Sequence, residues 1–284
     1  MAVIYILLPV HNRCEVTRRF IACLKSQTYQ NYHLVLIDDG STDGTQEMVR
    51  TEFADLTVIT GHGDWWWAGA LQQGYNWLRR QQLAPSDLVL IINDDTEFCG
   101  AFLERAVHLL RGQKRSLLQA PSFGRETGRL VGSGVRVDWR KLKFTATVAP
   151  DEINCLSTRG LFLTADDFLE LGGFYPKWLP HYLSDYEYTI RACRSGMNLR
   201  VDNSLRLLVD EKMTGFHQLD NESFRGFWKK YFSRRSDANP FAWTMFIALA
   251  CPWPWKPLSW LRVWYGTAVK VLKAMSTGKD GRQC

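Results

Sequence analysis

Two acidic turns in the N-terminal third of the chain carry side chains that could do chemistry. The segment Asp38–Ser41 follows the apolar run 33–37, and the segment Asn93–Thr96 follows the apolar run 87–92. An aspartate at the first turn can accept hydrogen bonds from a base N–H or a ribose hydroxyl, although Asp and Gly also simply make good turns. The second turn makes a binding role the better interpretation.

The second turn has the spacing of a divalent-cation site. Asn93 and Asp95 are two residues apart, so their side chains leave a strand end in the same direction. Such oxygen ligands suit a hard cation that stays partly hydrated and shares its other positions with a diphosphate. Asp94 faces the opposite way and is predicted to reach a bound sugar or a backbone amide.

Alternating apolar runs and helical patterns position these turns. Apolar runs predict strands, and apolar residues at helical spacing predict helices. The predicted order is strand 3–8, helix 15–24, strand 33–37, helix 45–53, strand 56–60, helix 69–82, strand 87–92 and helix 101–111. This alternation predicts a mostly parallel, doubly wound sheet, in which ligands bind beyond the carboxyl ends of the strands. Both acidic turns therefore fall on one edge.

From residue 117 the pattern changes to short β segments punctuated by glycine, as in 129–132 and 135–137. A helix is predicted after Thr164, whose hydroxyl forms a capping box with Asp167, and it ends at Gly172. Another helix is predicted from Ser184 to about residue 196. This part is interpreted as a smaller, mixed β region.

Composition indicates a folded chain. Its 284 residues are 46% hydrophobic, enough for one large domain or a domain with an appendage. The seven cysteines form no C-x-x-C pair, so neither a zinc site nor a disulfide framework is indicated. The segment 1–9 lacks the features of a signal peptide and is interpreted as a buried strand. A reducing cytoplasm is the simplest compartment.

The charge is concentrated in a C-terminal extension. Residues 225–284 hold eleven Lys/Arg against two Asp/Glu, a net charge of +9, and six of the twelve tryptophans. The apolar run 241–250 is too short to cross a bilayer, and prolines follow it. The pattern favours an interfacial anchor on the inner face of the cell membrane. The alternatives are a helix packed on the body and a homodimer contact. Nucleic acid is disfavoured because the tail is apolar and rich in Trp.

Taken in order, the motifs resemble the inverting GT-A glycosyltransferases of family 2. The matching segments are Leu8–Arg13, Gln27–Tyr29, Val35–Thr45, Asn93–Thr96, Gly172–Phe174 and Ser184–Glu187. The resemblance covers about residues 3–220. Trp66–Ala70 and the Asn-Asp-Asp-Thr form are similar to rhamnosyltransferase-like members that decorate bacterial cell-surface polysaccharides.

The resemblance implies roles for individual residues. It places Pro9, His11, Arg13 and Asp39 around the nucleoside, and Trp67, Gly69, Asn93 and Asp94 near the donor. Asp95 matches the last acid of the family's D-x-D metal motif, whereas Asn93 is a weaker ligand than the usual first Asp. His217 matches a histidine that reaches the metal or the diphosphate. The implied cofactor is Mg²⁺ or Mn²⁺.

The resemblance also assigns a catalytic base. Asp185 matches the acid that deprotonates the acceptor hydroxyl, and Glu187 is expected on the acceptor side. The neighbouring acid of the family's E-D pair is Ser184 here. With no adjacent acid and a helix N-terminus nearby, the pKa of Asp185 is expected near or below its ordinary value. The local alternative is a Ser184–Glu187 capping box that only starts a helix.

The sequence thus predicts a transferase that moves a sugar from a UDP- or dTDP-sugar to a hydroxyl of a glycan or lipid-linked acceptor. The expected division is a catalytic domain over 1–224, with halves 1–116 and 117–224, and the extension 225–284. A sugar nucleotidyltransferase is disfavoured because no glycine-rich loop follows the first strand. A binding relative without activity is the second alternative.

Overall fold

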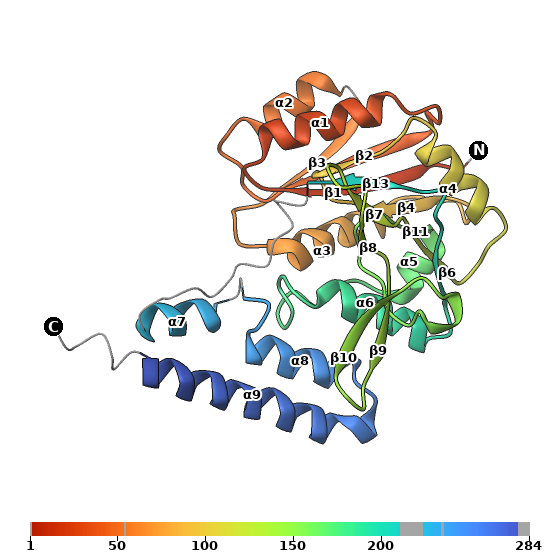
Figure 1. Cartoon of the computed structure of the whole chain (residues 1–284). Coiled ribbons are helices and arrows are strands. Elements are labelled where there is room, and N and C mark those ends of the chain that lie inside the picture. Colours follow the sequence, from red (N-terminus) through yellow and green to blue (C-terminus); the bar gives the residue numbers. More distant parts are fainter. Residues whose placement is uncertain (1, 54, 211–223, 234–235, 278–284) are drawn as a thin grey trace.

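The main β-sheet runs through the centre of the molecule (Figure 1). The computed structural model describes residues 2–53, 55–210, 224–233 and 236–277. Within these, seven strands pair in the order β12-β6-β11-β4-β1-β2-β3. Their bounds are β1 Ile4–Val10, β2 Tyr32–Asp38, β3 Leu56–Thr60, β4 Leu88–Ile91, β6 Ser116–Gln119, β11 Leu161–Thr164 and β12 Asn198–Val201.

The predicted parallel sheet is confirmed for β1, β2, β3 and β4, which pair in parallel register. Strand β11 lies inside the same sheet and runs antiparallel to both β4 and β6. The sheet is therefore mixed. Strands from both sides of residue 116 take part in it.

Helices cover both faces of this sheet because alternate residues of its strands point to opposite sides. The helices are α1 Cys14–Lys25, α2 Thr45–Glu52, α3 Trp66–Leu78, α4 Phe102–Leu110, α5 Ala165–Leu171 and α6 Ser184–Arg194. Helices α1, α2 and α4 pack with Ile6 and Leu8 of β1. Helices α3, α5 and α6 pack with Leu7 on the other side. This is the doubly wound arrangement expected from the sequence.

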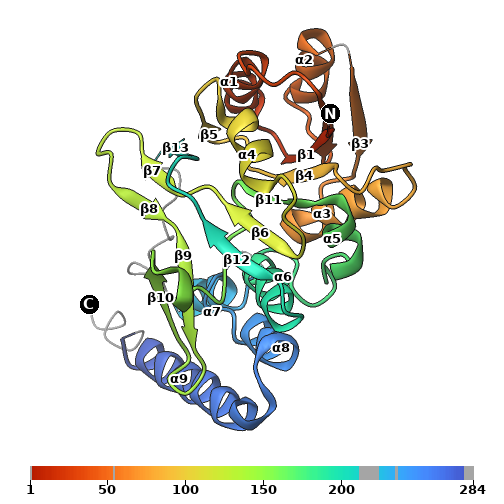
Figure 2. The ribbon, with the colours of Figure 1, turned by 90° about the vertical axis from the view of Figure 1, so that its right-hand side faces the viewer.

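Smaller β elements lie beside the main sheet (Figure 2). Four short strands pair in the order β5-β13-β7-β8, and β9 and β10 form a separate hairpin. Their bounds are β5 Thr96–Glu97, β7 Ser122–Gly124, β8 Leu130–Gly132, β9 Gly134–Asp138, β10 Lys143–Thr147 and β13 Leu207–Val209. The short β segments expected after residue 117 are thus present.

The described part of the C-terminal extension folds into three α-helices, and Figure 1 shows them below α6. They are α7 Phe224–Tyr231, α8 Pro240–Ala250 and α9 Lys256–Thr277. Phe246 and Ala250 of α8 are buried in one cluster with Leu179 and with Ile190 of α6. In the part of the chain that the structure describes, no helix is both long and apolar enough to cross a bilayer.

Candidate active site

Most of the predicted site residues that the structure describes lie in loops at the carboxyl edge of the parallel strands, where open α/β sheets bind ligands. The loops after β1, β2, β3 and β4 all leave the sheet at this edge. Because β11 is antiparallel to β4, with Leu161 opposite Ile91, the turn before β11 reaches the same edge.

Asp39 organises the loops after β1 and β3. One carboxylate oxygen accepts the Gly63 N–H at 2.8 Å, and the other accepts those of Trp65 and Trp66 at 2.9 and 3.1 Å. Its carbonyl lies 2.7 Å from Nδ1 of His11. Asp39 is only 6% exposed, and its carboxylate is used to hold the backbone of the loop after β3. By satisfying amides at the start of α3, it also explains why this helix begins before the predicted residue 69.

The loop after β1 is bonded to the loop after β2 and presents His11 at the surface. The backbone N–H of Asn12 donates to the Ser41 hydroxyl, and the side-chain oxygen of Asn12 accepts the Thr42 N–H at 2.8 Å. Pro9 lies beyond the β1–β4 ladder, which ends at Leu7. A proline is tolerated there because no ladder bond to β4 is needed. Of the residues that the resemblance names, His11 contacts Asp39 and Pro9 lies opposite Ile37 of β2, whereas Arg13 pairs with Asp94.

Asp94 points into the body of the protein. It is 5% exposed, and its Oδ2 accepts a hydrogen bond from the Thr17 hydroxyl at 2.8 Å. Its Oδ1 is 3.1 Å from Nε of Arg13. Burial raises its pKa to about 6, and Arg13 and Thr17 oppose this rise. The expected contact with the donor sugar is not what this geometry favours, because Asp94 holds Arg13 instead.

Asp95 faces the cleft between two arginines. Its Oδ2 is 3.6 Å from Nη2 of Arg13 and 4.0 Å from Nη2 of Arg159. Its Oδ1 is buried and has no hydrogen-bond partner among the described residues. A buried carboxylate oxygen without a partner is rare, and it is available as a ligand. Asn93, two residues earlier, is partly exposed at the same strand end.

Asn93 and Asp95 could hold a divalent cation only if substrate phosphates and water supplied its other ligands. No three His, Cys, Asp or Glu side chains converge on one point in the described ranges. Mg²⁺ is often held by one or two carboxylates together with substrate phosphates and water. The free oxygen of Asp95 and the amide of Asn93 fit that arrangement. His217, the third expected ligand, lies outside the described residues.

Arg159 is a site residue that sequence reasoning missed. Its turn directly precedes β11, and its side chain is 25% exposed. The sequence shows only an Arg-Gly pair before the buried run 161–164. Only the antiparallel direction of β11 brings this pair to the cleft, and the local pattern does not indicate strand direction.

Asp185 lies in the first turn of α6, where part of the residue meets solvent while its carboxyl is packed among neighbouring groups. This burial raises its pKa to about 6, while the Tyr186 N–H, 2.9 Å from Oδ1, and the charge of Arg159 act in the opposite direction. The expectation of an ordinary or lowered pKa was therefore wrong, because desolvation outweighs the helix N-terminus. A carboxylate with this pKa is mostly ionised at neutral pH and can still take a proton.

The local alternative for α6, a Ser184–Glu187 capping box, does not form. Leu183 at φ 67° is the N-cap, and the Ser184 hydroxyl donates to the His181 carbonyl. Glu187 is buried and pairs with Arg191 through both oxygens, at 3.0 and 3.2 Å. Glu187 thus supports the helix, and this placement does not favour the expected acceptor-side role.

The tryptophan triplet and Gly69 pack the start of α3 against the body. The Trp67 indole N–H donates to the Thr158 hydroxyl at 3.3 Å. A Cβ at Gly69 would lie 3.1 Å from Cβ of Trp65, so this glycine permits close packing. Trp66 has φ 58° and meets the ring of His181 edge-on. Trp67 and Gly69, both expected as donor contacts, thus serve packing here.

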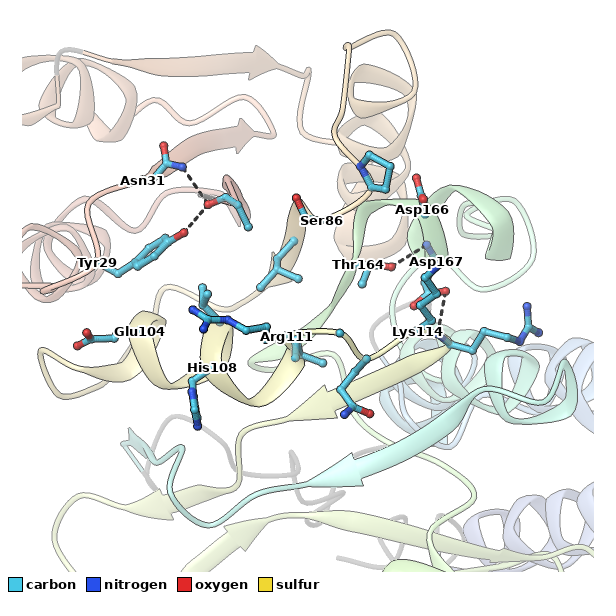
Figure 3. A pocket seen from close by; sticks show the side chains of 18 of the residues that line it. Tyr29, Asn31, Ser86, Glu104, His108, Arg111, Lys114, Thr164, Asp166 and Asp167 are labelled. Carbon is cyan, nitrogen blue, oxygen red and sulfur yellow. Dashed lines mark hydrogen bonds between the residues drawn. The ribbon is translucent and has the colours of Figure 1, made fainter.

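A cavity of about 1260 Å³ lies at the other end of the sheet (Figure 3). It is lined by Tyr29, His108, Arg111 and Lys114 among others, and Ala2, just before β1, borders it. Parallel strands begin at this edge, so the cavity is separate from the candidate site.

Comparison with known proteins finds similar glycosyltransferases. The chain is 25% identical over 207 residues to the glycosyltransferase AglE of Haloferax volcanii, covering 68% of this chain and 62% of that protein. It is 46% identical over 51 residues to an uncharacterised glycosyltransferase of Haemophilus influenzae, covering 18% of this chain and 20% of that one. The chain thus spans less than two thirds of these curated relatives.

Solved structures share the fold. S. aureus TarS superposes with a TM-score of 0.59 at 17% identity, covering all of this chain and 56% of that one. The mannosyltransferase PcManGT from Pyrobaculum calidifontis, in complex with GDP-Man and Mn²⁺, gives 0.58 at 17% identity, covering 98% and 79%. The predicted GT-A fold is thereby confirmed.

The family model described as glycosyl transferase family 2 matches residues 5–153, just over half of the chain. The matched range contains Asp39, Asp94 and Asp95 with the loops that hold them, whereas Arg159 and Asp185 follow it. This chain belongs to glycosyl transferase family 2.

Proposed function

We propose that the protein is an inverting glycosyltransferase that moves a sugar from a nucleoside diphosphate sugar to an acceptor hydroxyl. The observation that carries this proposal is the arrangement at one sheet edge. There Oδ2 of Asp95 lies between the guanidinium groups of Arg13 and Arg159, and its Oδ1 has no hydrogen-bond partner among the described residues. Asp185, whose pKa is about 6, is close enough to Arg159 to feel its charge.

In the proposed reaction, the acceptor oxygen forms a bond to the anomeric carbon as the bond from that carbon to the diphosphate breaks. Asp185 takes the hydroxyl proton, and the nucleoside diphosphate leaves with the bond's electron pair. Attack opposite the leaving group inverts the anomeric centre. Asp39 keeps the nucleoside loops in place before the donor arrives, because its backbone bonds are already formed.

We further propose that Asp95 and Asn93 hold Mg²⁺ or Mn²⁺ against the donor diphosphate. When bound, such a cation neutralises charge on the diphosphate. The related mannosyltransferase structure is a complex with GDP-Man and Mn²⁺, which supports this assignment. A UDP- or dTDP-sugar donor and a glycan or lipid-linked acceptor remain our proposals, as does a role in cell-surface polysaccharide synthesis like that of rhamnosyltransferases.

The test is donor turnover together with nucleotide binding. Purified protein is incubated with a panel of labelled nucleotide sugars and Mg²⁺ or Mn²⁺, and slow donor hydrolysis is measured without an acceptor. The Asp185→Asn variant should still bind the nucleoside diphosphate in a thermal-shift assay but lose hydrolysis. If the wild type neither binds nor hydrolyses any donor, a binding relative without this activity becomes the better interpretation.

A second proposal concerns the extension 225–284, which we assign to an anionic membrane surface. Helix α9 exposes apolar side chains at helical spacing, among them Leu261 at 67%, Tyr265 at 71% and Leu272 at 65%. Arg262 and Lys273 are exposed residues of the same helix. An exposed apolar strip with cations suits an interface rich in acidic lipid. A second copy of the chain fits less well, because it would bring two extensions of charge +9 together.

Vesicle flotation tests the membrane proposal. The double variant Leu261→Glu, Leu272→Glu should lose binding to vesicles that contain phosphatidylserine. The matched control is Val148→Glu, because Val148 is 61% exposed but lies in the body. Equal flotation of the double variant and the wild type would contradict the proposal, and a concentration-dependent dimer would favour the alternative contact.

A further inference from the structure

Arg159 is held on a fixed turn at the cleft. Ser157 accepts a hydrogen bond from Gln119 at 2.6 Å, and Thr158 accepts one from Trp67 at 3.3 Å. On the other side, the Gly160 carbonyl accepts the Ala120 N–H at 2.9 Å. Gly160 has φ 69°, and a Cβ there would meet the Leu207 side chain at 2.5 Å. Neighbouring bonds therefore fix the turn, whereas the Arg159 side chain projects from it.

The donors of Arg159 have no acceptor among the described residues. A guanidinium carries five N–H donors in a rigid plane. Although it is only 25% exposed, Arg159 makes no hydrogen bond within the part of the chain that the structure describes, and its nearest acid there, Asp95, is 4.0 Å away. Compare Arg191, which is 22% exposed and donates to Glu187 and two carbonyls. A partly buried guanidinium without hydrogen-bond partners contributes little to the stability of the fold, and its donors are available to bind an anionic ligand.

The charges at the site call for such a cation when the donor is cleaved. This step rests on the proposed function. A nucleoside diphosphate sugar carries one negative charge on each phosphate, and breaking the bond to the sugar adds a further charge at the β-phosphate. A divalent cation matches only the first two. Asp95, the proposed cation ligand, has its Oδ2 4.0 Å from Nη2 of Arg159, so a diphosphate on that cation would lie close to the guanidinium.

We propose that Arg159 binds the β-phosphate of the donor and stabilises the charge that this phosphate gains as the sugar leaves. The planar fork can give two parallel N–H bonds to one phosphate, which an ammonium group cannot. The charge of Arg159 also acts on Asp185. We therefore place Arg159 between the leaving diphosphate and the proposed base.

Differential nucleotide binding tests this role. Dissociation constants are measured by calorimetry for UDP, dTDP and GDP and for their monophosphates, with Mn²⁺, in the wild type and in Arg159→Gln. The variant should bind the preferred diphosphate about ten- to a hundredfold more weakly, the range for a lost charge-assisted hydrogen bond. Binding of the matching monophosphate should change less than about twofold, because it has no β-phosphate.

Two further variants serve as controls. Arg159→Lys keeps the charge and should recover part of the diphosphate affinity. Arg105→Gln removes an equal charge from the exposed face of α4, where Arg105 bonds the Ser204 carbonyl, and should change neither constant. The proposal is overturned if Arg159→Gln binds the diphosphate with the wild-type affinity, or if it loses affinity for the diphosphate and the monophosphate by the same factor. Failure of the proposed function is distinct, because then the wild type itself binds no nucleoside diphosphate.

Discussion

Replacing Asp185 by Asn should stabilise the fold while abolishing sugar transfer. Burial moves the pKa of this carboxyl from an ordinary 3.8 to about 6. The folded state therefore disfavours the charged form, and each pKa unit corresponds to about 1.4 kcal/mol. At pH 7.5 the wild type should be less stable than the Asn variant by up to about 3 kcal/mol. The Tyr186 N–H bond can be kept by the amide oxygen.

The upward direction of the Asp185 pKa shift determines how this stability difference depends on pH. A raised folded-state pKa means that the unfolded chain ionises first, so the wild type loses stability as pH rises from about 3.8 to about 6. Above that range the deficit is constant. The advantage of the Asn variant should shrink to about 1 kcal/mol at pH 4.5 and vanish near pH 3.

Urea unfolding at pH 7.5 and 4.5 measures this difference. Asp166→Asn, which replaces an exposed acid in the first turn of α5, is the matched control. It should slightly destabilise the protein, by about 0.3–1 kcal/mol, through loss of a favourable charge at a helix N-terminus. An Asp185→Asn variant that is less stable than the wild type at pH 7.5, or equally favoured at both pH values, would refute the desolvation argument.

Three further outcomes follow from the site. Transfer activity should fall about tenfold per pH unit below pH 6, because protonated Asp185 is no base; a pH–rate profile flat down to pH 5 would speak against it. Asp95→Ala should remove the dependence of diphosphate-induced thermal stabilisation on Mn²⁺, and an unchanged metal response would exclude Asp95 as a ligand. Asp39→Ala should lower the free energy of unfolding by about 3 kcal/mol or more, since three backbone N–H groups lose a charged acceptor, and denaturation by urea measures this change.

The sequence predicted the parallel half of the sheet well because each strand and helix there has its own periodicity. It also placed Asp39 and Asp95 on one edge, because both turns follow predicted parallel strands. What it could not supply was burial. Asp39 and Asp94 were predicted to contact the ligand, yet both are nearly buried and hold other protein groups. Arg159 escaped notice because strand direction depends on tertiary pairing, which no local pattern encodes.

The packing of α8 on α6 limits how this protein can be dissected. Helix α6 carries Asp185 in its first turn, and its outer face is covered by Phe246 and Ala250 of the extension. A chain shortened before α8 would expose that face to water and disturb the helix that carries the proposed base. Loss of activity on truncation would then say nothing about lipid, and only surface substitutions can separate attachment from chemistry.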